Sequence, residues 1–161
     1  MRTLVAAGLI STVMLLAGCG DDEQDSGATA TPRGTTTAAG EGTEINVTLQ
    51  EWSIIPETDS ADAGEITFNV ENIGPDDVHE VAIVKTELEP DSLPTVADGS
   101  VDEQGEGVEV IDEIEDFPVG ETQSLTVDLE AGAYVLICNI YDEAEAEAHY
   151  AEGMLTAFTV E

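Results

Sequence analysis

The feature that most constrains the fold of this chain is a series of short apolar runs separated by turn-forming residues. Several runs place an apolar side chain at every second position, as in Ile66, Phe68 and Val70, which is the period of a strand with one buried face. Gly, Pro and Asp lie between the runs, and no long segment has the 3.6-residue period of a helix. The runs cover residues 45–49, 54–55, 66–70, 78–84, 108–114, 125–129, 134–140 and 155–160. This pattern predicts an all-β sandwich of about seven or eight strands.

Two connections in this region are unusual. Residues 86–107 contain Pro and Gly among many acidic residues, and a loop of that length is commonly functional or carries a short helix of its own. Residues 142–148 form a second, strongly acidic stretch with the sequence DEAEAEA. The nearly continuous apolar run 134–140, which ends just before this stretch, is typical of a central strand.

The chain before residue 43 has a different composition. Residues 1–18 have an early Arg, an apolar run too short for a normal membrane span and small residues at the end, which together predict a secretory signal peptide. Their end, with Cys19, reads Leu-Ala-Gly-Cys and resembles the lipobox of bacterial lipoproteins, in which lipid is attached to the Cys thiol after cleavage. Residues 19–42 have no aliphatic side chain larger than Ala, so we expect a flexible tether between lipidated Cys19 and a domain at 43–161. The alternative is an ordinary cleaved signal with an incidental Cys.

The chain is extremely acidic, with 36 Asp and Glu against 3 Lys and Arg. The acidic residues are spread over most of the chain after residue 20 rather than gathered in one tail. Such a charge destabilises the compact state by self-repulsion unless salt screens it, which indicates a halophilic protein that works at high salt. A surface that docks a basic partner is the alternative. Nucleic-acid binding through a basic patch is excluded, because the chain has no such patch.

Four side chains form a candidate metal site: His79, Cys138, His149 and Met154. Without residues 1–18 the chain has no other His or Met, and Cys19 is its only other Cys. Two imidazoles, a thiolate and a weak thioether suit copper that cycles between its +1 and +2 states. Taken singly, such residues are usually surface His, inert Cys and core Met, and zinc on the same set is conceivable. Their ordered placement favours copper, and with both His assigned to metal no nucleophile–base set remains, so we expect no enzyme.

Residues 43–161 resemble the cupredoxins, the plastocyanin and azurin type of small blue-copper protein. The motifs that carry the resemblance are Asn72-Ile-Gly-Pro-Asp-Asp-Val-His79 and Gly132-Ala-Tyr-Val-Leu-Ile-Cys138, followed by His149 and Met154. The resemblance implies a Greek-key β-sandwich with one type 1 copper near one end. It also implies that His79, Cys138 and His149 are the equatorial ligands and that Met154 is the axial ligand.

The sequence departs from the family pattern at three places. Ten residues separate Cys138 from His149, more than in the small electron carriers of the family. Glu80 follows His79 where many members have an Asn that steadies the ligand loops, and no Pro immediately precedes His149. Negative charge near copper stabilises Cu(II), so we expect the acidic insert to lower the redox potential. The alternative is that this loop is acidic only because the whole surface is.

In cupredoxins the edge of the loop His is the usual exit for electrons, and the resemblance implies the same for His149. We expect Ala148, Tyr150 and Ala151, together with Tyr141, to surround this edge with a small apolar patch ringed by acidic residues. A patch of that kind suits a brief encounter with a redox partner.

Together these features predict a monomeric copper protein that is anchored by lipid at the outer face of the cytoplasmic membrane. Its expected function is to carry single electrons between membrane-associated redox proteins. The same donors would also serve copper capture or delivery outside the cell. A third possibility is a metal-free β-sandwich binding domain in which the four residues coincide by chance.

Overall fold

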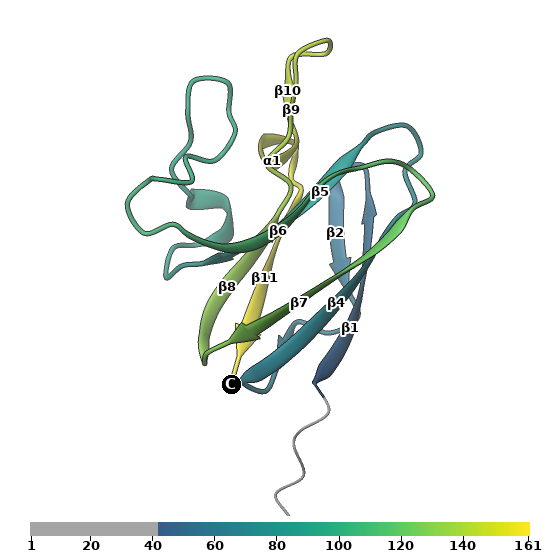
Figure 1. Ribbon diagram of the computed structural model, residues 1–161. Helices are drawn as coiled ribbons and strands as arrows, with labels where there is room; N and C mark the ends of the chain where they lie inside the picture. The colour runs from purple at the N-terminus through teal and green to yellow at the C-terminus, as the bar shows by residue number, and fades with distance from the viewer. Residues whose placement is uncertain (1–41) are drawn as a thin grey trace, which may run out of the picture. The chain divides into compact units, whose positions relative to one another are not determined.

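The computed structural model describes residues 42–161, which form a β-sandwich of two layers (Figure 1). The predicted signal peptide, Cys19 and all but the last residue of the predicted tether lie outside the described residues. Eight strands of four or more residues build the sandwich, and three strands of two residues accompany them. The predicted all-β sandwich is therefore confirmed. In residues 42–161 no helix is long and apolar enough to cross a membrane.

One layer is a four-stranded sheet with the strand order β2, β1, β4, β7. Its strands are β1 (Thr43–Gln50), β2 (Ser53–Pro56), β4 (Gly64–Asn72) and β7 (Thr122–Leu129). β1 runs parallel to β4, and β7 runs antiparallel to it. Ile66, Phe68 and Val70 of β4 are fully buried, whereas the residues between them are not, so the period of two in the sequence corresponds to one face turned inwards.

The other layer is a five-stranded sheet with the order β3, β11, β8, β5, β6. Its strands are β3 (Ser60–Ala61), β5 (His79–Lys85), β6 (Glu109–Phe117), β8 (Gly132–Ile137) and β11 (Leu155–Val160). β8 pairs antiparallel with both β5 and β11. The two layers meet in one core, where the rings of Phe68 and Phe158 contact edge to face with centroids 5.4 Å apart.

Residues 81–84 of β5 and 134–137 of β8 are apolar at every position because both faces of these strands are covered. Their outward-facing side chains form a second cluster with residues of the 86–107 connection and with Tyr150. The predicted excursion with a short helix is present as η1 (Pro90–Ser92). The Tyr150 hydroxyl fixes this connection, since it accepts a hydrogen bond from the N–H of Leu93 (3.1 Å) and donates one to the carbonyl of Pro90 (2.8 Å).

The acidic insert folds into a small hairpin of β9 (Tyr141–Asp142) and β10 (Glu147–Ala148), which projects beyond the sandwich in Figure 1. The exposed tip of the hairpin is residues 143–146. The helix α1 (His149–Glu152) follows directly and ends at Gly153, whose φ of 109° turns the chain into β11. The strand predicted over 134–140 ends earlier in the structure, where β8 ends at Ile137 and Cys138 follows it directly.

Candidate metal centre

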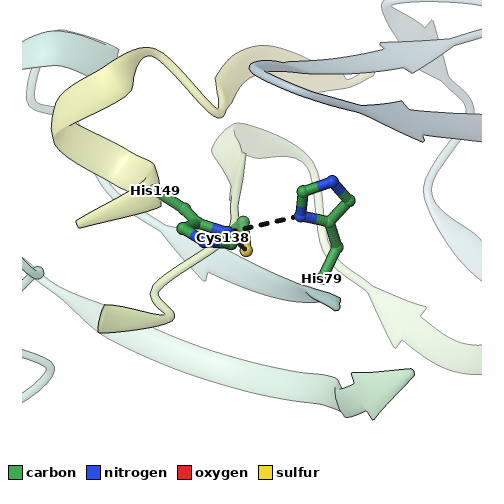
Figure 2. A group of neighbouring side chains, drawn as sticks. All are labelled: His79, Cys138 and His149. Carbon is green, nitrogen blue, oxygen red and sulfur yellow. Dashed lines mark hydrogen bonds between the residues drawn. The ribbon is translucent and has the colours of Figure 1, made fainter. Parts of the chain in front are cut away.

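Three of the four predicted donors converge at one end of the sandwich. The ligand atoms of His79, Cys138 and His149 all lie within 4.8 Å of one another (Figure 2). Sγ of Cys138 is 3.2 Å from Nδ1 of His149, and the two Nδ1 atoms of the imidazoles are 3.3 Å apart. All three residues are buried, with exposed fractions of 0%, 0% and 2%. The cluster is thus a closed site rather than a surface group of side chains.

Strand pairing explains why His79 and Cys138 meet although they lie 59 positions apart in the sequence (138 − 79). β5 begins at His79, β8 ends at Ile137, and the two strands are antiparallel neighbours, so both ends lie at the same edge of the sheet. The backbone N–H of Glu80 lies 3.4 Å from Sγ of Cys138 and donates to it. This N–H favours a thiolate at that position, because hydrogen bonds to the charged form stabilise it.

The loop from Cys138 to Met154 is closed by its own backbone. The N–H of His149 donates to the carbonyl of Ile140 (2.9 Å). This bond joins the residues on either side of the hairpin. The N–H of Met154 donates to the carbonyl of His149 (3.0 Å), and the carbonyl of Met154 accepts from the N–H of Cys138 (3.0 Å). Met154 itself is fully buried and belongs to the same core cluster as Cys138. The structure therefore brings all four predicted residues into one region.

The donors are electrically neutral when no metal is bound. Burial raises the pKa of the Cys138 thiol to about 12. Burial lowers the pKa of both imidazoles, and for His79 the neighbouring His149 lowers it further. A neutral imidazole has one unprotonated nitrogen, and the two Nδ1 atoms face each other and the sulfur. This buried set of two imidazoles and one thiol with a nearby thioether fits one type 1 copper ion.

Glu80 follows His79, at the position where many cupredoxins have an Asn. Its Oε1 accepts a hydrogen bond from the backbone N–H of Asn139 (2.8 Å). The residue after His79 is thus bonded to the residue after Cys138. Burial raises the pKa of Glu80 to about 7, and the nearby carboxylates of Glu113 and Glu103 act in the same direction. The departure noted in the sequence is thus a bridge between the two donor segments.

Two neighbouring residues that the sequence did not single out, Glu51 and Trp52, also contact the site. They lie in the turn between β1 and β2. Oε1 of Glu51 is 3.8 Å from Nε2 of His79, and the ring of Trp52 meets that of His149 edge-on with centroids 5.1 Å apart. No motif or periodicity marks these residues, because only the packing of the two sheets brings them to the donors.

The predicted apolar patch around His149 is wrong for Ala148 and Tyr150, whereas Ala151 is exposed and Tyr141 is half-buried. Ala148 and Tyr150 are only 3% and 6% exposed, because the hairpin and the 86–107 connection cover them. The surface beside His149 is instead a hollow of about 380 Å³ that Val78, Ile140, Tyr141 and four carboxylates line. The four carboxylates are those of Asp76, Asp77, Asp142 and Glu143.

Solved structures that are similar to this chain include auracyanins and rusticyanin. Auracyanin from Roseiflexus castenholzii aligns with 76% of this chain and 99% of its own at 21% identity and a TM-score of 0.53. Rusticyanin from Thiobacillus ferrooxidans aligns with 76% of this chain and 79% of its own at 15% identity and a TM-score of 0.53. Auracyanin A from Chloroflexus aurantiacus, described as a "blue" copper protein, aligns with 74% of this chain and 99% of its own at 18% identity and a TM-score of 0.50.

At these identities the comparisons show the fold, which is that of the cupredoxins. No protein-family model matches the chain, and a search of curated proteins finds no match.

Proposed function

We propose that this protein is a lipid-anchored type 1 copper protein outside the cytoplasmic membrane that carries single electrons between membrane-associated redox partners. The observation that carries the proposal is the convergence of His79, Cys138 and His149 within 4.8 Å inside a cupredoxin-type sandwich. Met154, buried in the same cluster, is the proposed axial ligand.

The residues of the site would each perform a defined task. Bound copper supplies a one-electron couple. Cys138 gives up its thiol proton and binds as thiolate, while His79 and His149 offer Nδ1. His79 and Cys138 stand at the ends of two paired strands, and the hydrogen bonds of Met154 tie the rest of the loop to Cys138. Donors held this firmly move little between oxidation states, which favours fast electron transfer.

The hollow beside His149 supports docking of a basic redox partner. Its carboxylates surround the approach to the only imidazole that lines it. Complementary charge would orient an encounter, although the long-range part of this attraction is screened at high salt. Copper capture or delivery is the second candidate, since the same carboxylates also attract a metal cation. Slow transfer of copper to a Cu(I) chelator would favour electron transfer, and rapid transfer would favour delivery.

The decisive experiment is the visible spectrum of the purified protein with Cu(II). We expect an intense thiolate-to-copper band that is absent in Cys138→Ser. Met154→Leu, the matched control in the same core, should keep the band and raise the redox potential, because the axial ligand tunes the potential. A wild-type spectrum identical to that of Cys138→Ser would refute the copper proposal.

The proposed anchor is tested separately. The full chain should be found in the membrane fraction of expressing cells and incorporate labelled fatty acid, whereas Cys19→Ser should do neither. Equal fractionation of the two proteins would contradict the anchor but leave the copper site untouched.

A further inference from the structure

Within residues 42–161, only two buried side-chain polar atoms lack a hydrogen-bond partner, and they belong to neighbouring groups. One is Nε2 of His79 and the other is Oε2 of Glu51. The side chain of His79 is 0% exposed and that of Glu51 is 12% exposed. Nε2 of His79 lies 3.8 Å from Oε1 of the same Glu51 carboxylate. Because unsatisfied buried polar atoms cost stability, two of them side by side at the donor cluster call for a functional reason.

Glu51 is held in place by the segment that leads to His79. Its Oε1 accepts hydrogen bonds from the backbone N–H groups of Asp76 (2.9 Å) and Asp77 (2.8 Å), just before β5. Both bonds go to one carboxyl oxygen, and hydrogen bonds donated to a carboxyl group favour its charged form. The hydrogen bonding therefore favours a carboxylate beside His79 Nε2.

The imidazole of His79 needs its proton on one particular nitrogen. Nδ1 faces the donor cluster, 3.3 Å from Nδ1 of His149, so it must be unprotonated to bind a metal. The single proton of the neutral ring then belongs on Nε2, the atom that faces Glu51. A carboxylate near that nitrogen favours this tautomer and increases the basicity of the opposite nitrogen.

We propose that Glu51 is a positioning residue of the metal centre, whose carboxylate keeps the His79 proton on Nε2 and so frees Nδ1 for the metal. Its negative charge, buried in the turn between β1 and β2, also favours the more highly charged oxidised metal. This inference rests on the proposed copper site and extends it to a residue outside the four donors. The carboxylate selects a cation and disfavours a neutral or anionic ligand at this position.

Two variants separate the charge of Glu51 from its hydrogen bonds. Glu51→Gln keeps an oxygen that can accept from the backbone N–H groups of Asp76 and Asp77, but it removes the charge. Glu51→Ala removes both. The matched control is Glu57→Gln, which also removes one negative charge. Glu57 directly follows β2, and its carboxylate accepts a hydrogen bond from the side chain of Asn46.

The first measurement uses the metal-free protein. Nitrogen-15 NMR of the imidazoles should show His79 protonated on Nε2 in the wild type and in the control, and less completely so in Glu51→Gln. Glu51→Ala should populate the Nδ1-protonated form and bind Zn(II) about 10- to 100-fold more weakly. A wild-type ring protonated on Nδ1, or unchanged tautomer and Zn(II) affinity in Glu51→Ala, would overturn the proposal.

The second measurement is the redox potential of the copper-loaded protein. Glu51→Gln should raise the potential more than Glu57→Gln does, and equal shifts would count against Glu51 even if Glu51→Ala does not fold. If the wild type binds no copper, the proposed function fails, whereas the tautomers in the metal-free protein still decide the role of Glu51.

Discussion

Carboxyl groups lie both beside the donors and on the hairpin, in very different surroundings. Glu51 and Glu80 are half-buried, and each accepts backbone hydrogen bonds from a segment that carries a donor. The hairpin carboxylates lie on a projection whose tip, residues 143–146, is exposed. Burial lowers the pKa of His149, and three nearby carboxylates shift it in the opposite direction. They are those of Asp77, Asp142 and Glu51, of which only Asp142 belongs to the hairpin.

This difference shows that position, not number, decides which acidic groups influence the site. Two charges about 10 Å apart in water interact by about 0.4 kcal/mol, and salt reduces this further. A buried charge is screened much less and acts on the donors at short range. Most acidic residues of the sequence thus lie on the surface, whereas Glu51 and Glu80 lie next to the metal-binding candidates.

The largest expected effect concerns the proton on the Cys138 thiol. Because burial raises the pKa of Cys138 to about 12, the thiol is protonated throughout the neutral range and loses its proton on binding copper. We expect release of one proton per Cu(II) and an affinity that rises about tenfold per pH unit between about pH 7 and 9. An indicator-dye titration measures this, with Cys138→Ser as the control. A pH-independent affinity would mean that the thiolate already exists without metal.

The second prediction concerns Glu80, whose pKa of about 7 in the folded protein lies above its ordinary value of 4.5. The folded state therefore binds this proton more tightly than the unfolded state does. The contribution of protonated Glu80 to the free energy of unfolding is fully present below pH 4.5 and is lost as the pH rises to about 7. Glu80→Gln keeps an acceptor for Asn139 and removes this loss. Its free energy of unfolding should exceed that of wild type by about 3 kcal/mol above pH 7.

Urea unfolding of the metal-free proteins at several pH values measures the Glu80 effect. The difference between Glu80→Gln and wild type should grow from about pH 4.5 to 7 and then stay constant. A difference independent of pH would show that Glu80 is not desolvated by the fold.

A smaller effect should separate two residues within the hairpin. Asp142→Asn keeps the oxygen that accepts from the N–H of Ala144 and should raise the redox potential by on the order of 20 mV at low salt. Glu145→Gln, at the exposed tip, should raise it less. Voltammetry at low and high ionic strength tests this, since both shifts should vanish near 1 M salt. Equal shifts at both positions would remove the distinction between the base and the tip of the hairpin.

The smallest effect is expected when the hairpin tip is shortened. Replacing residues 143–146 by Asn-Gly gives a two-residue turn between β9 and β10. The visible spectrum and the copper affinity should be unchanged, because the hydrogen bond from His149 to Ile140 lies below the replaced segment. Loss of the blue band would show that the tip helps to position His149.

The sandwich could be predicted from the sequence because half-buried strands leave a period of two, as in Ile66, Phe68 and Val70 of β4. The donors could be predicted because His, Cys and Met are so scarce in this chain. Their assignment as ligands stays a proposal, but three of them meet in the structure. The end of β8 was placed too late, since the apolar residues after Ile137 continue beyond the sheet.

What the sequence could not predict depends on contacts between distant segments. Tyr150 was expected on an apolar surface, but it is buried because its hydroxyl binds Pro90, 60 residues earlier. Glu51 precedes His79 by 28 residues and lies in the other sheet layer, so no local pattern connects them. Periodicity reports which face of a strand is buried, but not which turn from the opposite layer covers it.

The place of β11 in the five-stranded sheet sets an order on the maturation of the protein. This strand, residues Leu155–Val160, lies between β3 and β8 and pairs with residues almost 100 positions earlier. During synthesis on the ribosome, the sheet therefore stays open until these residues have emerged, although His79 and Cys138 are already made. The proposed donor set is likewise complete only when His149 and Met154, which shortly precede this strand, have been made.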